Sequence, residues 1–150
     1  MNHHRVRNLA ALWLVVSIAL SGCAIRLVAD YDSGTFDEVL KAEKEVDLFY
    51  GNLLETPQKE RSYSRYAGQY VSIETDLRLL VTRNKSRPLN QESTSISETI
   101  LKLWVKYKEK HQADNGYSDG NAKLDRAKFT RLFRAAASAE EAKKLEQGDQ

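Results

Sequence analysis

Apolar residues recur at alternating intervals of three and four positions along most of the chain after residue 35. That spacing places them on one face of an α-helix, and no stretch shows the period of two that a half-buried strand requires. Four such segments follow one another, so the predicted fold is all-α, a small bundle of about four helices over residues 35–137. Their stripes are Val39, Ala42, Val46, Phe49 and Leu53; Tyr63, Tyr66, Tyr70, Ile73, Leu77 and Leu80; Ile96, Ile100, Leu103 and Tyr107; and Leu124, Ala127, Phe129, Leu132, Phe133 and Ala136.

Local signals predict the ends of the first two helices. Thr35 and Glu38 have the spacing of a capping box, in which each side chain satisfies a backbone donor of the other residue. The first helix is therefore expected to open there and to end near Glu55, and the second to cover about Lys59 to Thr82. Gly68 lies inside the second helix, and because a helical glycine costs about 1 kcal/mol against alanine, it suggests a close helix crossing.

Polar segments separate the remaining helices. Residues 83–90 are expected to form a loop, and the third helix has two candidate starts, Asn90 and Ser95. Residues 113–120 contain the turn signals Asn-Gly and Asp-Gly and are expected to connect the third helix to the last. The last helix would begin near Asn121.

The beginning of the chain has the layout of a secretory signal peptide. Arg5 and Arg7 precede an apolar run over residues 9–20, which is too short for a membrane span of about 18 to 20 residues. The run ends in Leu20-Ser21-Gly22-Cys23, and these four residues resemble the lipobox of bacterial lipoproteins. Two other interpretations stay open: an incidental cysteine in an ordinary cleaved signal, and an uncleaved membrane-associated segment.

The lipobox resemblance implies a lipid anchor. In that class residues 1–22 are removed, the thiol of Cys23 receives a diacylglyceryl group, and the new amino group is acylated with a fatty acid such as palmitate. Ala24 follows the cysteine where an aspartate would favour the inner membrane, so the resemblance implies the outer membrane, facing the periplasm. Several acyl chains together bind a membrane stably, whereas one binds only marginally.

Polar segments are expected to flank the bundle. Residues 23–34 are predicted to form a short lipidated tether, and residues 138–150 a frayed or disordered tail, because few of them are apolar. Asp30-Tyr31-Asp32, followed by Thr35, resembles the start of small uncharacterised proteobacterial lipoproteins, which brings no activity with it.

Charge and length limit the possible functions. The chain has 23 Lys plus Arg and 21 Asp plus Glu, and loss of the two arginines in residues 1–22 leaves 21 of each in the 128 residues from Cys23 onward. A neutral body of this size is expected to form one domain and gives no electrostatic reason to expect nucleic acid as a partner. With one cysteine, no intrachain disulfide is expected, so packing must supply stability.

Residues for common catalytic chemistry are scarce. His111 is the single histidine outside residues 1–22, and near a helix end it is expected at the surface or as a partner of the helix dipole. Asp114 to Asp125 resembles a calcium loop poorly, because the sixth position is Asp119 where a glycine is required. We therefore expect no metal, no cofactor and no enzymatic activity, although an enzyme relying on carboxylates alone stays open.

Two basic regions are candidate interaction surfaces. Arg61 and Arg65 interleave with tyrosines, a pattern that suits lipid headgroups or glycans, although the tyrosines also fit a core stripe that the arginines merely flank. Arg126, Arg131 and Arg134 are expected to face outward on the last helix. The predicted function is an envelope lipoprotein that binds or scaffolds a protein partner; the alternative is a carrier of lipid or small ligands with an apolar cavity between the helices.

Overall fold

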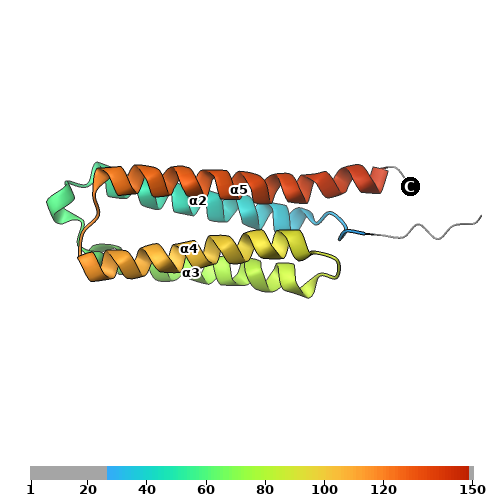
Figure 1. The fold of residues 1–150 in the computed structure, drawn as a ribbon, viewed down its shortest axis with the longest axis horizontal. Coiled ribbons are helices and arrows are strands. Elements are labelled where there is room, and N and C mark those ends of the chain that lie inside the picture. Colours follow the sequence, from blue (N-terminus) through green and yellow to red (C-terminus); the bar gives the residue numbers. More distant parts are fainter. Residues whose placement is uncertain (1–26, 149–150) are drawn as a thin grey trace, which may run out of the picture.

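The computed structural model describes residues 27–148, and within this range it contains four long helices and no strand. The helices run lengthwise in alternating directions (Figure 1), which confirms the predicted all-α bundle. Their bounds are Ser33–Glu55 for α2, Tyr63–Ser86 for α3, Gln91–Asp114 for α4 and Asp119–Gly148 for α5, with a short 3-10 helix, η1, at Gln58–Glu60.

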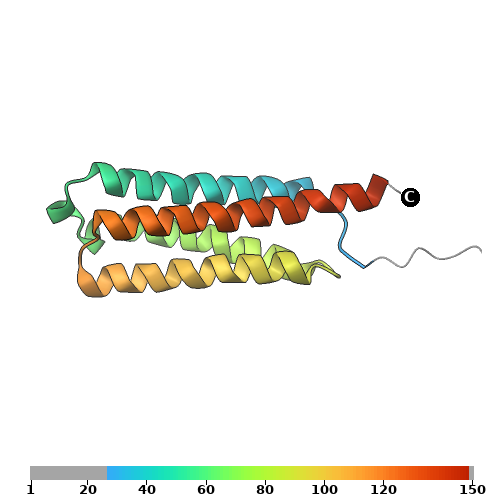
Figure 2. The ribbon, with the colours of Figure 1, turned by 45° about the horizontal axis from the view of Figure 1, so that its top comes forward.

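The four helices form a closed ring of neighbours. Each packs against the next helix in the chain, and α5 completes the ring against α2. The connections at residues 87–90 and 115–118 are four residues long, which brings consecutive helices together as antiparallel neighbours. Figures 1 and 2 show that α2 and α5 lie side by side, as do α3 and α4.

Aromatic side chains fill the middle of the bundle. Trp104 is fully buried, its ring centroid lies 5.0 Å from that of Phe49 and 5.1 Å from that of Tyr70, and its indole N–H donates to the carbonyl of Tyr70 at 3.3 Å. Phe129 from α5 closes the cluster, with its ring 5.8 Å from Trp104. Such tilted and edge-on ring pairs add about 0.5–1.5 kcal/mol each beyond their burial.

Most of the predicted stripes are buried, but two positions on α5 are not. Leu124 is 69% exposed and Ala127 also lies at the surface. Leu124 stands four residues before Lys128, which places it on the outward face of α5. The predicted Phe129, Phe133 and Ala136 are buried, and Ala122, which was not predicted, extends this buried face.

The predicted capping box at the start of the first helix is wrong. α2 begins at Ser33, and the side chain of Asp32 caps it by accepting from the backbone N–H groups of Gly34 and Thr35. Thr35 is buried in the first turn, and the carboxylate of Glu38 bonds to Arg83 at 2.6 Å. An aspartate at the N-cap can accept from the free backbone N–H groups of the first turn, as a threonine can. Asp32, three residues before Thr35, therefore takes the capping role that was predicted for Thr35.

The boundaries of α3 also differ from the prediction. It begins at Tyr63, later than Lys59, because residues 57–60 form the turn that contains η1. It continues to Ser86, so the predicted loop over residues 83–90 is shorter, and it ends there because Arg87 precedes Pro88 and adopts an extended conformation. Of the two candidate starts for α4, the structure has the one at Asn90.

Gly68 does not mark a close helix crossing. A Cβ atom added at this position would meet nothing within 4 Å outside its own neighbourhood, and the residue faces solvent. The expected close approach of a second backbone is therefore wrong.

The polar tail is ordered as helix over most of its length. α5 continues to Gly148, so the predicted frayed or disordered tail is wrong for residues 138–148. Glu140 and Lys143 are buried, and with Phe133 and Ala136 they follow the spacing of one helix face. The buried face continues along the helix while its chemistry changes from apolar to charged.

Candidate functional site

A buried charged group lies where the chain enters the bundle, and we call it the tether-end cluster: Asp32, Arg87, Asn90, Glu140 and Lys143. The carboxylate of Glu140 is 1% exposed and accepts from the backbone N–H of Asp32 at 2.8 Å, from Nζ of Lys143 at 2.5 Å and from Arg87, which lies 3.1 Å from each of its oxygens. A buried carboxylate is tolerated only when paired and hydrogen-bonded in this way.

The ammonium group of Lys143 has a complete set of acceptors. It donates to Oδ1 of Asn90 at 2.6 Å and to Oγ of Ser93 at 2.9 Å, in addition to Glu140, so its three donors have three partners. Asn90 donates in turn to the carbonyl and side chain of Asn84 at the end of α3. The cluster therefore joins α5 to both ends of the α3–α4 connection.

The electrostatics of the cluster favour charged carboxylates. Burial by itself would raise the pKa of Glu140, but hydrogen bonds from Arg87, Lys143 and the Asp32 backbone outweigh it and hold that pKa below its usual value. Burial likewise acts to raise the pKa of Asp32, and Arg83 together with Thr35 lowers it overall.

The same cluster fastens the tether to the bundle. The backbone N–H of Ala29 donates to the carbonyl of Leu89 at 3.0 Å, the side chain of Arg87 donates to the carbonyl of Asp30, and the backbone N–H of Asp32 donates to the carboxylate of Glu140. Ala29 itself is buried. Residues 29–32, predicted to belong to the tether, are thus built into the folded domain.

At the opposite end of the bundle, Arg61 is an internal connector. Its side chain is 3% exposed and donates to the carbonyls of Thr56 at 2.7 Å, Leu54 at 3.2 Å and Tyr117 at 3.1 Å, and to Asp119 at 2.6 Å. It therefore ties the end of α2 to the α4–α5 connection. The prediction that Arg61 belongs to an interaction surface is wrong.

His111 is buried beside this connector, so the expectation of a surface histidine is also wrong. Its Nε2 lies 2.8 Å from the carbonyl oxygen of Arg61, which can only accept, so Nε2 carries the proton. Nδ1 then accepts from the hydroxyl of Tyr70 at 3.0 Å. Burial lowers the pKa of His111, and the bond to Arg61 opposes only part of that change. The ring is consequently neutral and structural.

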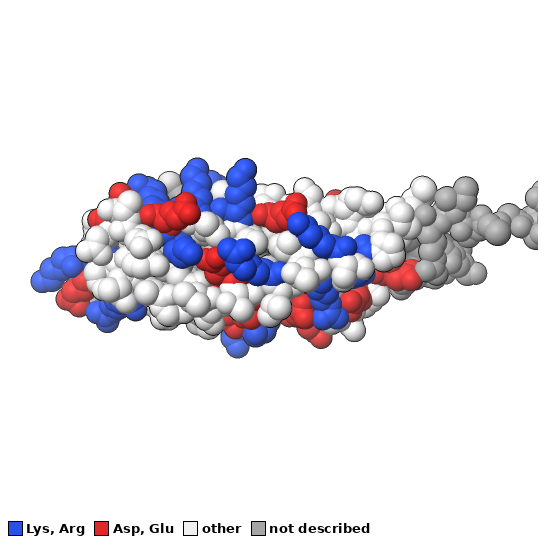
Figure 3. All heavy atoms as spheres, turned by 90° about the horizontal axis from the view of Figure 1, so that it is seen from below, with Lys and Arg blue, Asp and Glu red and all other residues white. Residues whose placement is uncertain are grey.

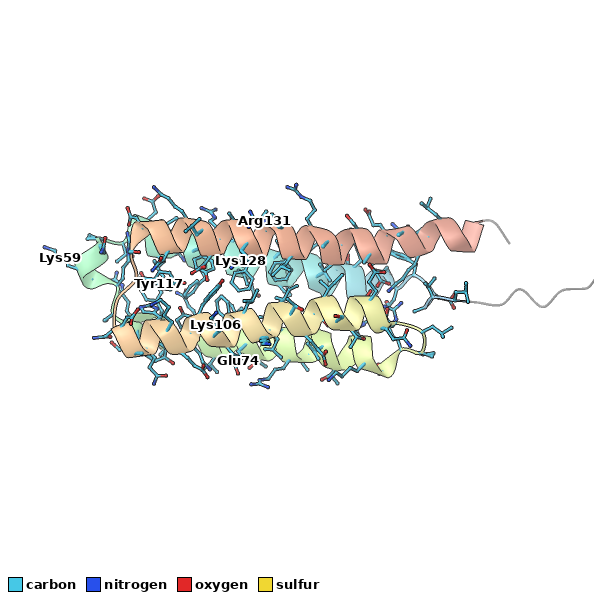
Figure 4. The ribbon with its side chains drawn as sticks, in the orientation of Figure 1. Lys59, Glu74, Lys106, Tyr117, Lys128 and Arg131 are labelled. Atoms are coloured by element: carbon cyan, nitrogen blue, oxygen red, sulfur yellow. The ribbon has the colours of Figure 1, made fainter. Side chains whose placement is uncertain are left out.

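Tyrosines extend the polar network between the helices. The hydroxyl of Tyr117 donates to Asp125 at 2.6 Å, so Tyr50, 3.5 Å away, is the donor in their contact. Figure 4 shows Tyr117 in the connection before α5. Tyr66 and Tyr70 are buried and Tyr63 stacks on Tyr70 at 5.7 Å, which confirms the interpretation of these tyrosines as a core stripe.

The other basic residues predicted to form interaction surfaces differ in exposure and in ion pairing. Arg126 makes a two-pronged contact with Asp47 of α2, at 2.6 and 2.8 Å, and this guanidinium lowers the pKa of Asp47. Arg65 is 56% exposed and lies 3.6 Å from Glu60. Arg131 (labelled in Figure 4) and Arg134 are exposed on α5, and neither has an ion-pair partner among the described residues.

A groove, called the α3–α4 groove below, runs along the outer side of that helix pair. It has a volume of about 1010 Å³. Figure 3 shows this lower face of the bundle, where blue and red side chains surround pale surface. Its apolar residues are Val81, Leu101, Leu103 and Val105, and its polar residues are Arg78, Thr82, Lys85, Glu98, Lys102, Lys106 and Glu109. Sequence reasoning missed it, because its residues come from two helices whose pairing the pattern alone does not specify.

Two further features are absent from residues 27–148, a metal site and a membrane-spanning helix. No three His, Cys, Asp or Glu side chains in that range are grouped so that they could hold a metal ion. In the same range, no helix has the length and apolar content to cross a membrane. The predicted lipidation site, Cys23, lies outside the described residues.

Comparison with models of protein families, with curated proteins and with solved structures found no match to this chain.

Proposed function

We propose that this chain is an envelope lipoprotein, anchored through lipid on Cys23, whose helical bundle binds and positions a protein partner beside the membrane. The observation that carries the proposal is the fastening of residues 29–32 into the tether-end cluster. Only residues 24–28 separate Cys23 from the buried Ala29, and six steps of extended chain reach at most about 22 Å. An anchor on Cys23 would hold the bundle near the membrane by its tether end.

This placement suits a binding module. Partners held in the same thin layer meet it at a raised effective concentration, which strengthens even a modest contact. The core favours this function over the alternative carrier function, which needs an apolar cavity between the helices. The middle of the bundle is occupied by the packed rings of Phe49, Tyr70, Trp104 and Phe129.

The polar groups also support a non-enzymatic role. His111 and Arg61 are held by internal hydrogen bonds, and every buried side-chain nitrogen and oxygen in the described part of the chain has such a partner. In the tether-end cluster, the carboxylate of Glu140 pairs with Arg87 and Lys143. Each of these arrangements stabilises the fold and thereby presents a rigid surface.

In-cell photo-crosslinking tests the proposal. A photo-reactive residue is placed on the full chain at Thr82, Arg131 or Arg134, with Lys44 of α2 as a comparison position; all four residues are exposed. The expected result is a specific adduct with an envelope protein from one face and not from Lys44. Absence of an adduct from every face would refute the proposal, and turnover of an envelope substrate by the purified chain would then favour an enzyme.

A further inference from the structure

The α3–α4 groove has the chemistry of a docking surface for another helix. Half-buried Leu101 and Val105 lie in it beside Val81 of α3, so the groove offers apolar contact over its middle part, between charged ends. Outward positions of α4 that line it run from Glu98 to Glu109, about 16 Å along the axis at a rise of 1.5 Å per residue. Three turns of a helix fit that length, and a third helix packs naturally between two neighbours.

The rim of the groove is positively charged. Arg78, Lys85, Lys102 and Lys106 line it against only Glu98 and Glu109, four positive charges against two negative ones. Lys85 is already paired with Glu98 at 2.6 Å and Arg78 with Glu74 at 2.6 Å.

Two rim lysines remain available to a partner. Lys102 and Lys106 are exposed, stand one turn apart on α4, and have no ion-pair partner among the described residues. Figure 4 labels Lys106 on α4 and Glu74 on α3; Glu74 bonds to Lys108 and Arg78. The unpaired positive charge thus lies along one edge of the apolar strip, where an acidic side chain of a docked helix would meet it.

Charge argues against a second copy of this chain as the occupant. A symmetric pair built on the same face would bring the rim of one copy against the rim of the other, because a two-fold interface uses the same patch twice. Both rims carry the same excess of positive charge, and juxtaposed like charges oppose binding. An occupant that has both apolar and acidic side chains would contact the apolar residues of the groove and pair with its positively charged rim.

We propose that the α3–α4 groove binds an amphipathic helical segment of a partner protein, about three turns long, with apolar side chains toward Leu101 and Val105 and acidic side chains toward Lys102 and Lys106. This inference rests on the proposed function and names the partner's chemistry. The apolar strip supplies contact area, and the lysines select against basic and neutral helices.

The test uses the full chain in cells with a photo-reactive residue at Thr82, on the α3 side of the groove. The expected adduct, mapped by mass spectrometry, attaches at a segment with apolar residues at helical spacing and Asp or Glu beside them. The double variant Lys102→Glu with Lys106→Glu is expected to reduce the adduct about tenfold or more, because it reverses both available charges. The matched control, Lys44→Glu with Lys123→Glu, makes the same change in net charge at exposed positions of α2 and α5 and should leave the adduct unchanged.

Every outcome bears on the inference. Circular dichroism and urea unfolding of both double variants establish that they fold, so a lost adduct reports on the groove. An adduct that resists the Lys102 and Lys106 reversal, or that joins a second copy, a lipid or a basic segment, overturns the inference. Adducts from Arg131 or Arg134 without one from Thr82 also overturn it, yet leave the proposed function standing. No adduct from any face contradicts both.

Discussion

Replacing Glu140 by glutamine is expected to destabilise the protein strongly, although sequence reasoning had assigned this residue to a disordered tail. The variant keeps the size of the side chain but removes the charge that neutralises Lys143 and Arg87, whose side chains are 8% and 15% exposed. Removing one partner from a buried ion pair costs about 3–5 kcal/mol. We expect about 3 kcal/mol, the lower end, because the amide still accepts a hydrogen bond and Arg87 reaches solvent.

Urea unfolding at pH 7 measures this change. In the chain from Ala24 onward Trp104 is the single tryptophan, and its burial makes its fluorescence a reporter of the folded core. With a slope of about 1.5 kcal/mol per molar urea, the loss corresponds to a fall of about 2 M in the midpoint. The matched control is Glu141→Gln, which makes the same chemical change at the next, exposed position and should alter stability by less than about 0.5 kcal/mol.

The pH dependence gives a second check on the same residue. Because the folded pKa of Glu140 lies below its ordinary value of 4.5, its contribution is fully present above that value. It is lost as the pH falls through the folded pKa, so the difference between the wild type and Glu140→Gln should shrink below about pH 4.5. Equal midpoints at pH 7, or a difference that persists unchanged in acid, would show that the tether-end cluster does not contribute as argued.

The remaining predictions concern three separate parts of the chain. Gly68→Ala should raise stability in urea by about 1 kcal/mol, since the added methyl meets open space and alanine favours helix; a loss would mean that the glycine is needed. His111 should titrate by NMR with a pKa below its ordinary 6.5, so stability should fall as the pH drops from about 6.5 through the folded pKa; a value at or above 6.5 contradicts its burial as a neutral ring. Cys23→Ser should abolish lipid labelling and leave unprocessed precursor, and unchanged membrane association of a mature form would refute the anchor.

Much of the helical fold was predictable because the apolar spacing is a local property of the chain. Val46, Phe49, Ile73 and Leu77 all lie in the core as their three- and four-residue intervals require. A helix with an apolar stripe must bury that stripe against other elements, away from water. Four such helices joined by short polar segments therefore form a bundle. The errors at helix ends were local too. Asp32 caps α2 in place of the predicted Thr35, and α3 continues until Arg87, the residue before Pro88, adopts an extended conformation.

The candidate surfaces could be predicted only in part. Arg131 and Arg134 were expected at the surface of the last helix and lie there, but Arg126 is engaged by Asp47, 79 residues away in sequence. Arg61 and Arg65 lie in the same stretch of interleaved arginines and tyrosines, and yet Arg61 is buried. Its acceptors are mostly backbone carbonyls, which every residue carries and no sequence pattern identifies.

By itself, then, the sequence determined the helical class, most of the buried faces of the first three helices and the residues from which common catalytic sites would have to be built. Tertiary structure alone decided which charges are internal. Glu140 is buried with Lys143 on its own helix, but its partners Asp32 and Arg87 lie 108 and 53 residues away. A buried charge is stable only when opposite charges and hydrogen-bond donors converge on it, and that convergence arises when separate helices pack.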